Sequence, residues 1–310
     1  MKKNNITFTF LISVLLFLLG TGCEKTYETG PRPSGSSSNT NGDGSQVQEP
    51  VEGVDYFLPH INLNNWKVTL PIGSGSPTEI HPPEILDYAD NALLQDFMYN
   101  DSTDGSLVFY TYPGGATTTN SSYPRTELRE LMDGGNGKVN WTFAEGGRMK
   151  GTLSVPEISK DAGGNFHRTI IMQIHGRLTD AQKNQIGASD NNAPPILKIS
   201  WYEGKIRINS KVLNDLNASN TEILETSAWG NDSGFNFTEE VWHDKFILEI
   251  IASEGRMEVI LNESESKVYE GIHMEKWGVF ENYFKAGNYL GSTAVDAFAK
   301  VKYYDLEVSH

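Results

Sequence analysis

Short strand-like runs separated by glycine turns fill most of the chain after residue 54. Eight of them are rich in β-branched and aromatic residues: SLVFYTY, RMKGTLSV, RTIIMQIH, PILKISWY, KIRINS, KFILEIIA, RMEVILN and AKVKYYDLEVS. Turn sequences such as PGG at 113–115 and DAGGN at 161–165 stand between them. Only EILDYAD and the residues near TEILETSA suggest short helices. This pattern predicts an all-β sandwich or jelly roll.

Several of the predicted strands present a polar and often cationic face. Side chains two residues apart in a strand point the same way, so Arg125, Glu127 and Arg129 share a face of RTELR. By the same rule Lys198 and Arg207 lie opposite the apolar side chains of their strands. A solvated face is one explanation. However, Lys and Arg should not dominate such faces in a chain with a formal net charge of −15. If these strands are neighbours, one sheet carries a groove lined with basic and amide side chains.

The run TIIMQIHGR at 169–177 combines a core-like strand with two polar side chains. Alternation places Gln173 and His175 on one face together with Ile171. Ile170 and Met172 then lie on the opposite face. An isolated Gln-x-His pair occurs by chance on half-exposed strands, so the pair gains meaning only from the rest of the chain.

The N-terminus has the layout of an export signal. Lys2 and Lys3 precede an apolar run at 6–20, which is too short to span a bilayer comfortably. Cys23 follows GTG and is the only cysteine, so no internal disulfide can form. We predict a lipoprotein-type signal peptide at 1–22, with Cys23 as the lipidated residue. The alternative is an ordinary cleaved signal.

The segment after Cys23 differs in composition from the rest of the chain. Residues 23–53 are rich in Ser, Gly and Pro, and such sequences form flexible tethers. No repeat or second linker divides 54–310, which predicts one monomeric domain. We expect an exported protein anchored by a lipid to the bacterial envelope, at the outer membrane, with an extracellular location as the alternative. The acidic charge argues against nucleic acid as a partner.

Three motifs occur in order along the domain: SSYPRTELRE at 121–130, QIH at 173–175 and NYFKAGNYL at 282–290. Together with NNWKVTLPIG at 64–73, they resemble the alginate lyases of polysaccharide lyase family seven. The resemblance covers 54–310. It implies a concanavalin-like β-jelly roll, a two-sheet sandwich with a concave substrate groove. One departure is Gly291, where many relatives place Gln after the tyrosine motif.

The resemblance also implies a reaction. An alginate lyase removes the C5 proton of a uronate, which is α to the carboxylate, and expels the 4-linked oxygen by β-elimination. An unsaturated uronate then remains at the new non-reducing end. Arg125 and Gln173 would neutralise the carboxylate, since a guanidinium donates two parallel hydrogen bonds to such a group. His175 would be the base and Tyr289 the acid.

The resemblance implies further contacts to alginate, and the scheme requires neither a metal nor another cofactor. The predicted substrate-binding residues are Glu127, Arg129, Lys198, Arg207, Tyr283 and Lys285. Five other histidines show no ligand spacing, so no metal site is predicted; they are His60, His81, His167, His243 and His273.

The resemblance also bears on the preferred sugar, because the two uronates of alginate differ in the geometry of elimination. In guluronate the C5 proton and the leaving oxygen lie on opposite ring faces, so base and acid must be separate groups. In mannuronate they lie on one face, where a single tyrosine could serve both steps. Relatives with Ile between the Gln and His tend to accept guluronate-containing chains, and this chain has Ile174. We therefore predict guluronate or mixed blocks as substrate, with internal or terminal cleavage left open.

Three alternatives stay open at the level of sequence. A glycoside hydrolase on the same fold needs two carboxylates, which the laminarinase-like group takes from an E-x-D-x-x-E strand. The chain contains no E-x-D triplet. A non-catalytic carbohydrate-binding module would need the cationic groove but not Gln173, His175 and Tyr289 together. A lyase for another polyuronate is excluded only by the family resemblance.

Overall fold

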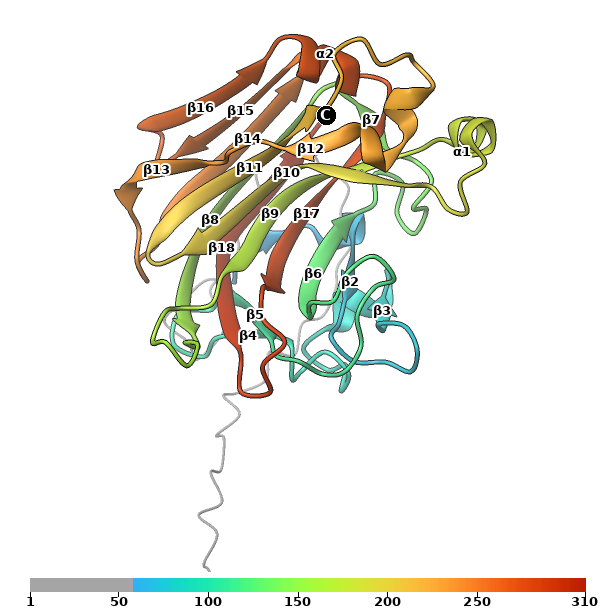
Figure 1. Ribbon diagram of the computed structural model, residues 1–310. Coiled ribbons are helices and arrows are strands. Elements are labelled where there is room, and N and C mark those ends of the chain that lie inside the picture. The colour runs from blue at the N-terminus through green and yellow to red at the C-terminus, as the bar shows by residue number, and fades with distance from the viewer. Residues whose placement is uncertain (1–57) are drawn as a thin grey trace, which may run out of the picture. The chain divides into compact units, whose positions relative to one another are not determined.

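The computed structural model describes residues 58–310, which form two packed β-sheets (Figure 1). The predicted signal peptide at 1–22, the tether at 23–53 and Cys23 lie outside the described residues. Within 58–310, no helix has the length and apolar character needed to cross a membrane.

One sheet contains eight strands in the order β16-β15-β14-β8-β18-β5-β4, and β1 pairs in parallel with β18. All other pairings of this sheet are antiparallel. Its strands are β1 (His60–Ile61), β4 (Met98–Asn100), β5 (Leu107–Thr111), β8 (Gly147–Ile158), β14 (Phe246–Ser253), β15 (Arg256–Leu261), β16 (Glu265–Glu270) and β18 (Ala299–Ser309).

The other sheet contains ten strands in the order β12-β11-β10-β9-β17-β6-β2-β3, with β13 on β11 and β7 on β17. Its strands are β2 (Trp66–Thr69), β3 (Glu79–Ile80), β6 (Arg125–Glu130), β7 (Trp141–Thr142), β9 (Thr169–Arg177), β10 (Asn192–Tyr202), β11 (Lys205–Leu213), β12 (Trp229–Asn231), β13 (Phe235–Glu240) and β17 (Glu281–Leu290). The three motif strands β6, β17 and β9 are direct neighbours at the centre of this sheet.

Helices are short and lie between strands. They are η1 (Leu63–Asn65), η2 (Glu84–Asp87), α1 (Asp180–Ile186), η3 (Glu222–Leu224), η4 (Thr226–Ala228) and α2 (Ile272–Trp277). The two predicted helical regions are the 3₁₀ turns η2, η3 and η4. Helices α1 and α2 lie outside the predicted helical regions. A capping box of Thr179 and Gln182 begins α1 and Gly187 ends it, but α1 buries no residue and so has no apolar periodicity.

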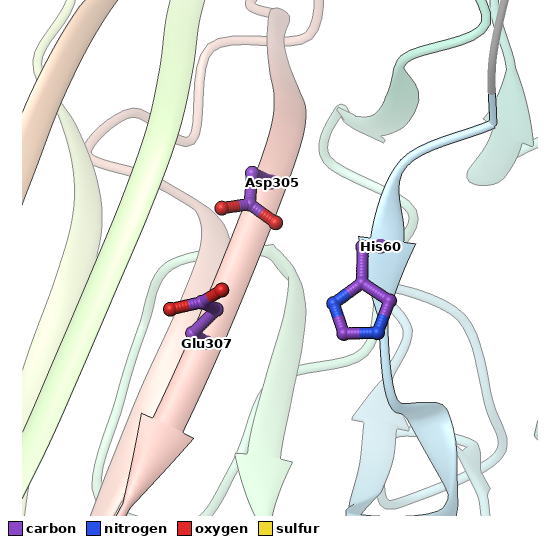
Figure 2. Close-up of side chains that lie close together, drawn as sticks. All are labelled: His60, Asp305 and Glu307. Carbon is purple, nitrogen blue, oxygen red and sulfur yellow. The ribbon is translucent and has the colours of Figure 1, made fainter. Parts of the chain in front are cut away.

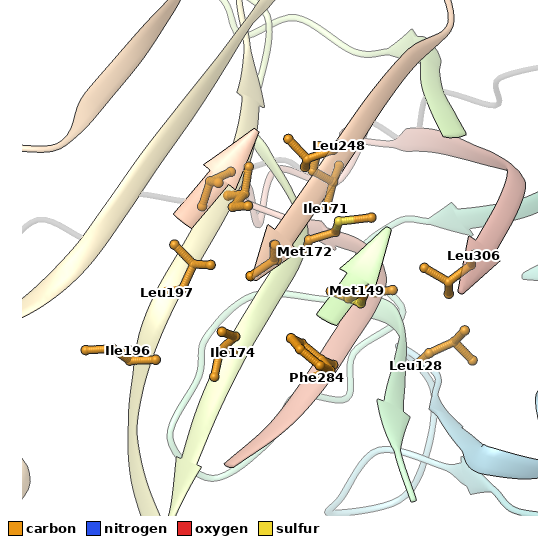
Figure 3. Close-up of a cluster of buried hydrophobic side chains, with 14 of the residues drawn as sticks. Leu128, Met149, Ile171, Met172, Ile174, Ile196, Leu197, Leu248, Phe284 and Leu306 are labelled. Atoms are coloured by element: carbon orange, nitrogen blue, oxygen red, sulfur yellow. The ribbon is translucent and has the colours of Figure 1, made fainter. Parts of the chain in front are cut away.

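The eight strands predicted from the sequence are all present, and the two-sheet jelly roll is confirmed. Strand β9 departs from the predicted alternation. Against β10, Ile171 is an extra residue in β9. Against β17, the extra residue lies in β17, where Gly287 and Asn288 stand opposite Ile171. Ile171 therefore turns into the core beside Met172 (Figure 3). Ile170 becomes the Cα partner of Tyr289. The prediction that Ile171 shares a face with Gln173 and His175 is wrong, because a bulge reverses the alternation.

The core lies between the sheets and brings them into close contact behind the motif strands (Figure 3). A Cβ atom on Gly151 of β8 would lie 2.8 Å from Cε of Met172, so glycine permits this approach. Phe284 packs on Trp141 with ring centroids 4.8 Å apart. Truncating a buried Phe to Ala typically costs about 3–5 kcal/mol. This packing fixes the strand whose outward residues are Tyr283 and Lys285.

Candidate active site

The predicted site residues lie on one face of the ten-stranded sheet. We call this face, which points away from the eight-stranded sheet, the site face. Arg129, Lys285, Gln173 and Lys198 are successive Cα partners across β6, β17, β9 and β10. Residues paired in this way project on the same side of a sheet. The residues that alternate with them, including Phe284, are buried in the core.

The predicted base and acid lie on opposite sides of this row. His175 pairs with Tyr283 on one side. Tyr289 pairs with Arg125 on the other. Glu127 pairs with Gly287 between them. The register therefore separates the imidazole from the phenol along the strand direction.

Glu127 is the centre of the site. Its carboxylate accepts hydrogen bonds from Gln173 Nε2, from Lys285 Nζ and, at 3.2 Å, from Arg125 Nη1. Its exposed fraction is 2%. Burial alone would raise the pKa of Glu127, but Lys285, Arg125 and the hydrogen bonds outweigh burial and hold it below its usual value. We call these four residues the Glu127 cluster.

The Glu127 cluster carries a net positive charge when Lys285 is protonated, since it contains two cations and one anion. Burial lowers the pKa of Lys285 to about 8, although Glu127 opposes this effect. Glu127 was predicted to contact substrate. The structure favours a different role, because the oxygens of the Glu127 carboxylate already accept hydrogen bonds from protein donors. Glu127 instead orients the two predicted carboxylate-binding side chains, Arg125 and Gln173.

His175 is held as a neutral imidazole. Its Nδ1 lies 2.9 Å from the carbonyl oxygen of Gly176. Only a protonated Nδ1 can donate to a carbonyl, so Nε2 carries the lone pair. Burial, reinforced by the charge of Lys285, lowers the pKa of His175 to about 3. A ring in this state can accept a proton at Nε2.

Tyr283 and Arg129 support His175 from one side. The Tyr283 ring stacks on the His175 ring with centroids 5.2 Å apart, and the Arg129 guanidinium lies 4.0 Å from the centroid of Tyr283. Arg129 also donates to the carbonyl oxygens of Glu130 and Gly137 and to Asn140 Oδ1. These contacts occupy donors that a direct substrate contact would need. The geometry favours a supporting position for Arg129 over the predicted substrate contact.

Tyr289 is fixed by three neighbours. Its hydroxyl lies 2.6 Å from Ser121 Oγ. The guanidinium carbon of Arg125 lies 3.9 Å from its ring centroid. Tyr123 contributes a ring 6.4 Å away. Buried Arg125 Nε has no hydrogen-bond partner among residues 58–310, so the protein does not use all the donors of this guanidinium.

A buried polar network holds the two bulged strands beneath Tyr289. Gly287 N–H donates to the Tyr303 hydroxyl at 3.1 Å, and that hydroxyl donates to the carbonyl of Ile171 at 2.6 Å. Asn288 donates to two carbonyls of the opposite sheet. At Gly287, φ is +132° and a Cβ would lie 2.7 Å from the carbonyl oxygen of Thr126, so only glycine fits. This network fixes the backbone just before Tyr289 and so fixes the position of the Tyr289 side chain on the site face.

Two predicted substrate contacts are not members of the Glu127 cluster: Lys198 lies next to it as the Cα partner of Gln173, and Arg207 lies further out on β11. Lys198 has no ion pair among residues 58–310; burial, then the nearby Lys211 and Arg168, lower its pKa. Arg207 donates to Asn236 at 2.9 Å and to the carbonyl of Ser233 at 2.8 Å. Within the described domain, no hydrogen bond or ion pair joins Arg207 to the other predicted site residues.

Position 291 has a physical reason to be glycine. Gly291 N–H donates to the carbonyl of Arg168 at 2.7 Å. A Cβ atom there would lie 3.0 Å from the same carbonyl oxygen. The Gln that many relatives carry would therefore require Arg168 to shift.

Sequence reasoning missed Ser121, Asn288 and Tyr303. The first two lie inside the quoted motifs, at 121–130 and 282–290, but small polar residues in loops and strands are too common to single out. Tyr303 belongs to a strand of the opposite sheet, and nothing in AKVKYYDLEVS indicates which strand its hydroxyl meets.

Comparisons with a family model, with a solved structure and with a curated protein all identify alginate lyases as similar to this chain. A family model described as alginate lyase matches residues 61–310. The crystal structure of alginate lyase A1-II′, a member of polysaccharide lyase family 7, is 30% identical, covers 80% of this chain and 95% of that chain, and gives a TM-score of 0.63. An alginate lyase of Klebsiella pneumoniae is 24% identical over 288 residues, 80% of this chain and 89% of that protein.

A further solved structure supports the fold alone. The crystal structure of the alginate lyase from Klebsiella pneumoniae is 19% identical, covers 81% of this chain and 96% of that chain, and gives a TM-score of 0.58. The family model spans nearly all of the described residues, and the three motifs meet on neighbouring strands. The chain therefore belongs to the alginate lyases of polysaccharide lyase family 7.

Proposed function

We propose that this alginate lyase acts on guluronate-containing or mixed blocks, with His175 as base and Tyr289 as acid. The observation that carries the proposal is their separation: the His175–Tyr283 pair and the Tyr289–Arg125 pair lie on opposite sides of Glu127 along the strands. A uronate whose carboxylate lies on that cluster would meet one group on each side. Anti elimination from guluronate requires such an arrangement.

The Glu127 cluster is proposed to bind the uronate carboxylate. As the C5 proton leaves, negative charge moves onto that carboxylate. Donors that are already oriented stabilise this charge without reorganising, and such stabilisation is often the largest catalytic effect. Arg125 and Gln173 are oriented by Glu127, and Lys285 adds a second positive charge. The net positive cluster offsets the repulsion that an acidic protein would exert on a polyanion.

His175 suits proton removal because the fold keeps it neutral. With its pKa lowered to about 3, the imidazole is unprotonated at neutral pH. Its Nδ1–H is directed at the Gly176 carbonyl, which leaves Nε2 as the accepting atom. The C5 proton would pass to Nε2, and the electron pair of the C5–H bond would form the C4–C5 double bond as the C4–O bond breaks.

Tyr289 would complete the elimination by donating its phenolic proton to the leaving oxygen. Ser121 is in position to orient this hydroxyl, since its Oγ lies 2.6 Å away. As the phenol loses its proton, the Ser121 hydroxyl can donate to the resulting oxyanion. We propose Ser121 as a positioning residue that acts through Tyr289.

Ser121→Ala is expected to lower kcat about two- to tenfold with little change in KM, which corresponds to one neutral hydrogen bond. Ser121→Thr retains a hydroxyl and should recover most of the rate. Ser122→Ala is the matched control, because the neighbouring Ser122 is exposed. Steady-state kinetics on alginate check this. Equal kcat values for Ser121→Ala and Ser122→Ala would remove Ser121 from the proposal.

Complexes of a relative support the substrate class. Variants of alginate lyase A1-II′ have been solved with a product, GGG, and with a substrate, GGMG. G denotes guluronate and M mannuronate in alginate, so both ligands are rich in guluronate. These relatives are 30% and 29% identical to this chain.

The direct test of the proposed activity is incubation of the purified protein with alginate while ultraviolet absorbance is followed. β-Elimination creates a C4–C5 double bond conjugated to the carboxylate, so absorbance should rise as the polymer shortens. Shortening without absorbance would indicate a hydrolase. Binding without shortening would indicate a carbohydrate-binding module. A faster reaction on another polyuronate than on alginate would contradict the proposed substrate.

We also propose that the enzyme is anchored through a lipid on Cys23, because a GTG-Cys sequence follows the apolar run and precedes the Ser/Gly-rich tether. Cys23→Ser should move the protein from the membrane fraction to the soluble fraction, as checked by fractionating cells and immunoblotting. The unmodified protein must first sediment with membranes. A wild-type protein that is soluble outside the membrane would contradict the anchor.

A further inference from the structure

Three metal-ligating side chains gather on the eight-stranded sheet, away from the site face (Figure 2). His60 of β1 is the Cα partner of Asp305 in the parallel pairing with β18. Glu307 follows two residues later on β18 and therefore points to the same side of the sheet. Each of the three offers one ligand atom, and these atoms lie within 4.8 Å of one another.

These side chains are not fully engaged by protein partners. Among residues 58–310, no side-chain ion pair within 4.0 Å includes Asp305, although its carboxylate interacts with the backbone of Leu306 and with the charges of His60 and Glu307. Glu307 has one long contact, 4.0 Å from Arg148 Nη1, while Arg148 Nε donates to Glu249 at 2.5 Å. The strand partner of Glu307 is Lys150, whose ammonium lies 2.6 Å from Glu263 instead.

The donor set distinguishes between cations. Calcium and magnesium prefer oxygen ligands alone, whereas zinc and related ions combine imidazole nitrogen with carboxylate oxygens. Zn²⁺ bonds of about 2.0–2.2 Å in tetrahedral geometry place neighbouring ligand atoms about 3.4 Å apart. His60 and Glu307 are exposed, so both side chains can turn inward to reach this separation.

We propose that His60, Asp305 and Glu307 form a binding site for a divalent cation of the zinc class. The cation would offset the charge of the two carboxylates and join β1 to β18. Strand β1 contains only His60–Ile61, so few backbone hydrogen bonds fasten this start of the domain. Binding there stabilises the folded state, because a ligand that binds only the folded chain shifts the unfolding equilibrium. This inference does not depend on the proposed catalytic roles.

The site also explains why sequence reasoning predicted no metal. His60 and the two carboxylates lie at opposite ends of the domain, so no ligand spacing is visible along the chain. Parallel pairing of the first described strand with the last brings them together.

The test is titration of the chelator-treated full chain with ZnCl₂, followed by calorimetry and by thermal unfolding. Zn²⁺ should bind with one-to-one stoichiometry and raise Tm, and His60→Ala and Asp305→Asn should each weaken binding at least tenfold. His81→Ala is the matched control: His81 is half-exposed and lies 3.6 Å from a single carboxylate, that of Glu79. It should bind Zn²⁺ like the wild type.

Three results would overturn the site. The first is no Zn²⁺ binding by the wild type. The second is the same Zn²⁺ affinity in wild type, His60→Ala and Asp305→Asn. The third is a Tm rise with CaCl₂ that matches the rise with ZnCl₂ and survives His60→Ala, since two carboxylates alone would then account for binding. Alginate cleavage serves as a fold check, and it should be unchanged in His60→Ala.

Discussion

Tyr289→Phe is expected to lower kcat on alginate by about 10²–10⁴-fold, the usual contribution of a general acid or base. The loss should be large on both guluronate-rich and mannuronate-rich polymers. In either elimination the leaving oxygen needs a proton, and Tyr289 is the group that Ser121 and Arg125 hold in place. The ring remains in Tyr289→Phe, so its packing on Arg125 is kept. KM should therefore change much less than kcat.

Tyr123→Phe is the matched control for this prediction. Tyr123 lies beside Tyr289, with ring centroids 6.4 Å apart, and its side chain is exposed. It should retain nearly full activity. Steady-state kinetics on both polymers provide the measurement, with circular dichroism to verify folding. A Tyr289→Phe variant with wild-type kcat would remove the phenol from the reaction.

His175→Ala is expected to show a selective loss. On guluronate-rich polymer, kcat/KM should fall by about 10²–10⁴-fold, because the variant loses the proposed base, whose ring stacks on Tyr283 on one side of Glu127. On mannuronate-rich polymer, any residual activity should fall less, since Tyr289 alone can remove the proton and return it. His81→Ala serves as the control. His81 follows β3, the short strand at the edge of the ten-stranded sheet, so this variant should have the kcat/KM of the wild type on both polymers.

The pKa values of His175 and Lys285 predict how activity on alginate depends on pH. Burial lowers that pKa to about 3, so the base stays deprotonated from about pH 4 upward and does not limit activity on the acid side. On the alkaline side, the pKa of Lys285 is about 8. Above it Lys285 loses its charge, and the Glu127 cluster loses its net positive charge. Activity on alginate should therefore decline as pH rises through about 8.

Much of the fold could be predicted because strand alternation is a local property. The face of KIRIN follows from side chains two residues apart, and its alternating burial confirms it. In RTELR, Arg125 donates to Glu127, as expected of two side chains on one face. The bulge at Ile171 could not be predicted. It arises where β9 must match both β10 and β17, and it is held by a hydroxyl from the opposite sheet, that of Tyr303.

The site residues were found through motifs, but their division of labour depends on tertiary contacts. Glu127 lies two residues from both Arg125 and Arg129, so strand alternation predicts that all three side chains point to the same face. Only the neighbouring strands bring Gln173 and Lys285 onto the Glu127 carboxylate and bury it. Arg129 likewise differs from Arg125 because the loop at 137–140 occupies its donors. Strand alternation predicts the face to which each side chain points, but it does not reveal which side chain remains available to a ligand.

Two separate groups, His175 and Tyr289 on opposite sides of Glu127, are proposed to carry out the elimination. The most direct measurement is kcat/KM of His175→Ala and Tyr289→Phe on guluronate-enriched and mannuronate-enriched polymers, each relative to the wild type. Tyr289→Phe is expected to lose activity on both polymers by similar factors, while His175→Ala should lose at least tenfold more on guluronate than on mannuronate. Equal losses on the two polymers for His175→Ala would contradict this proposal.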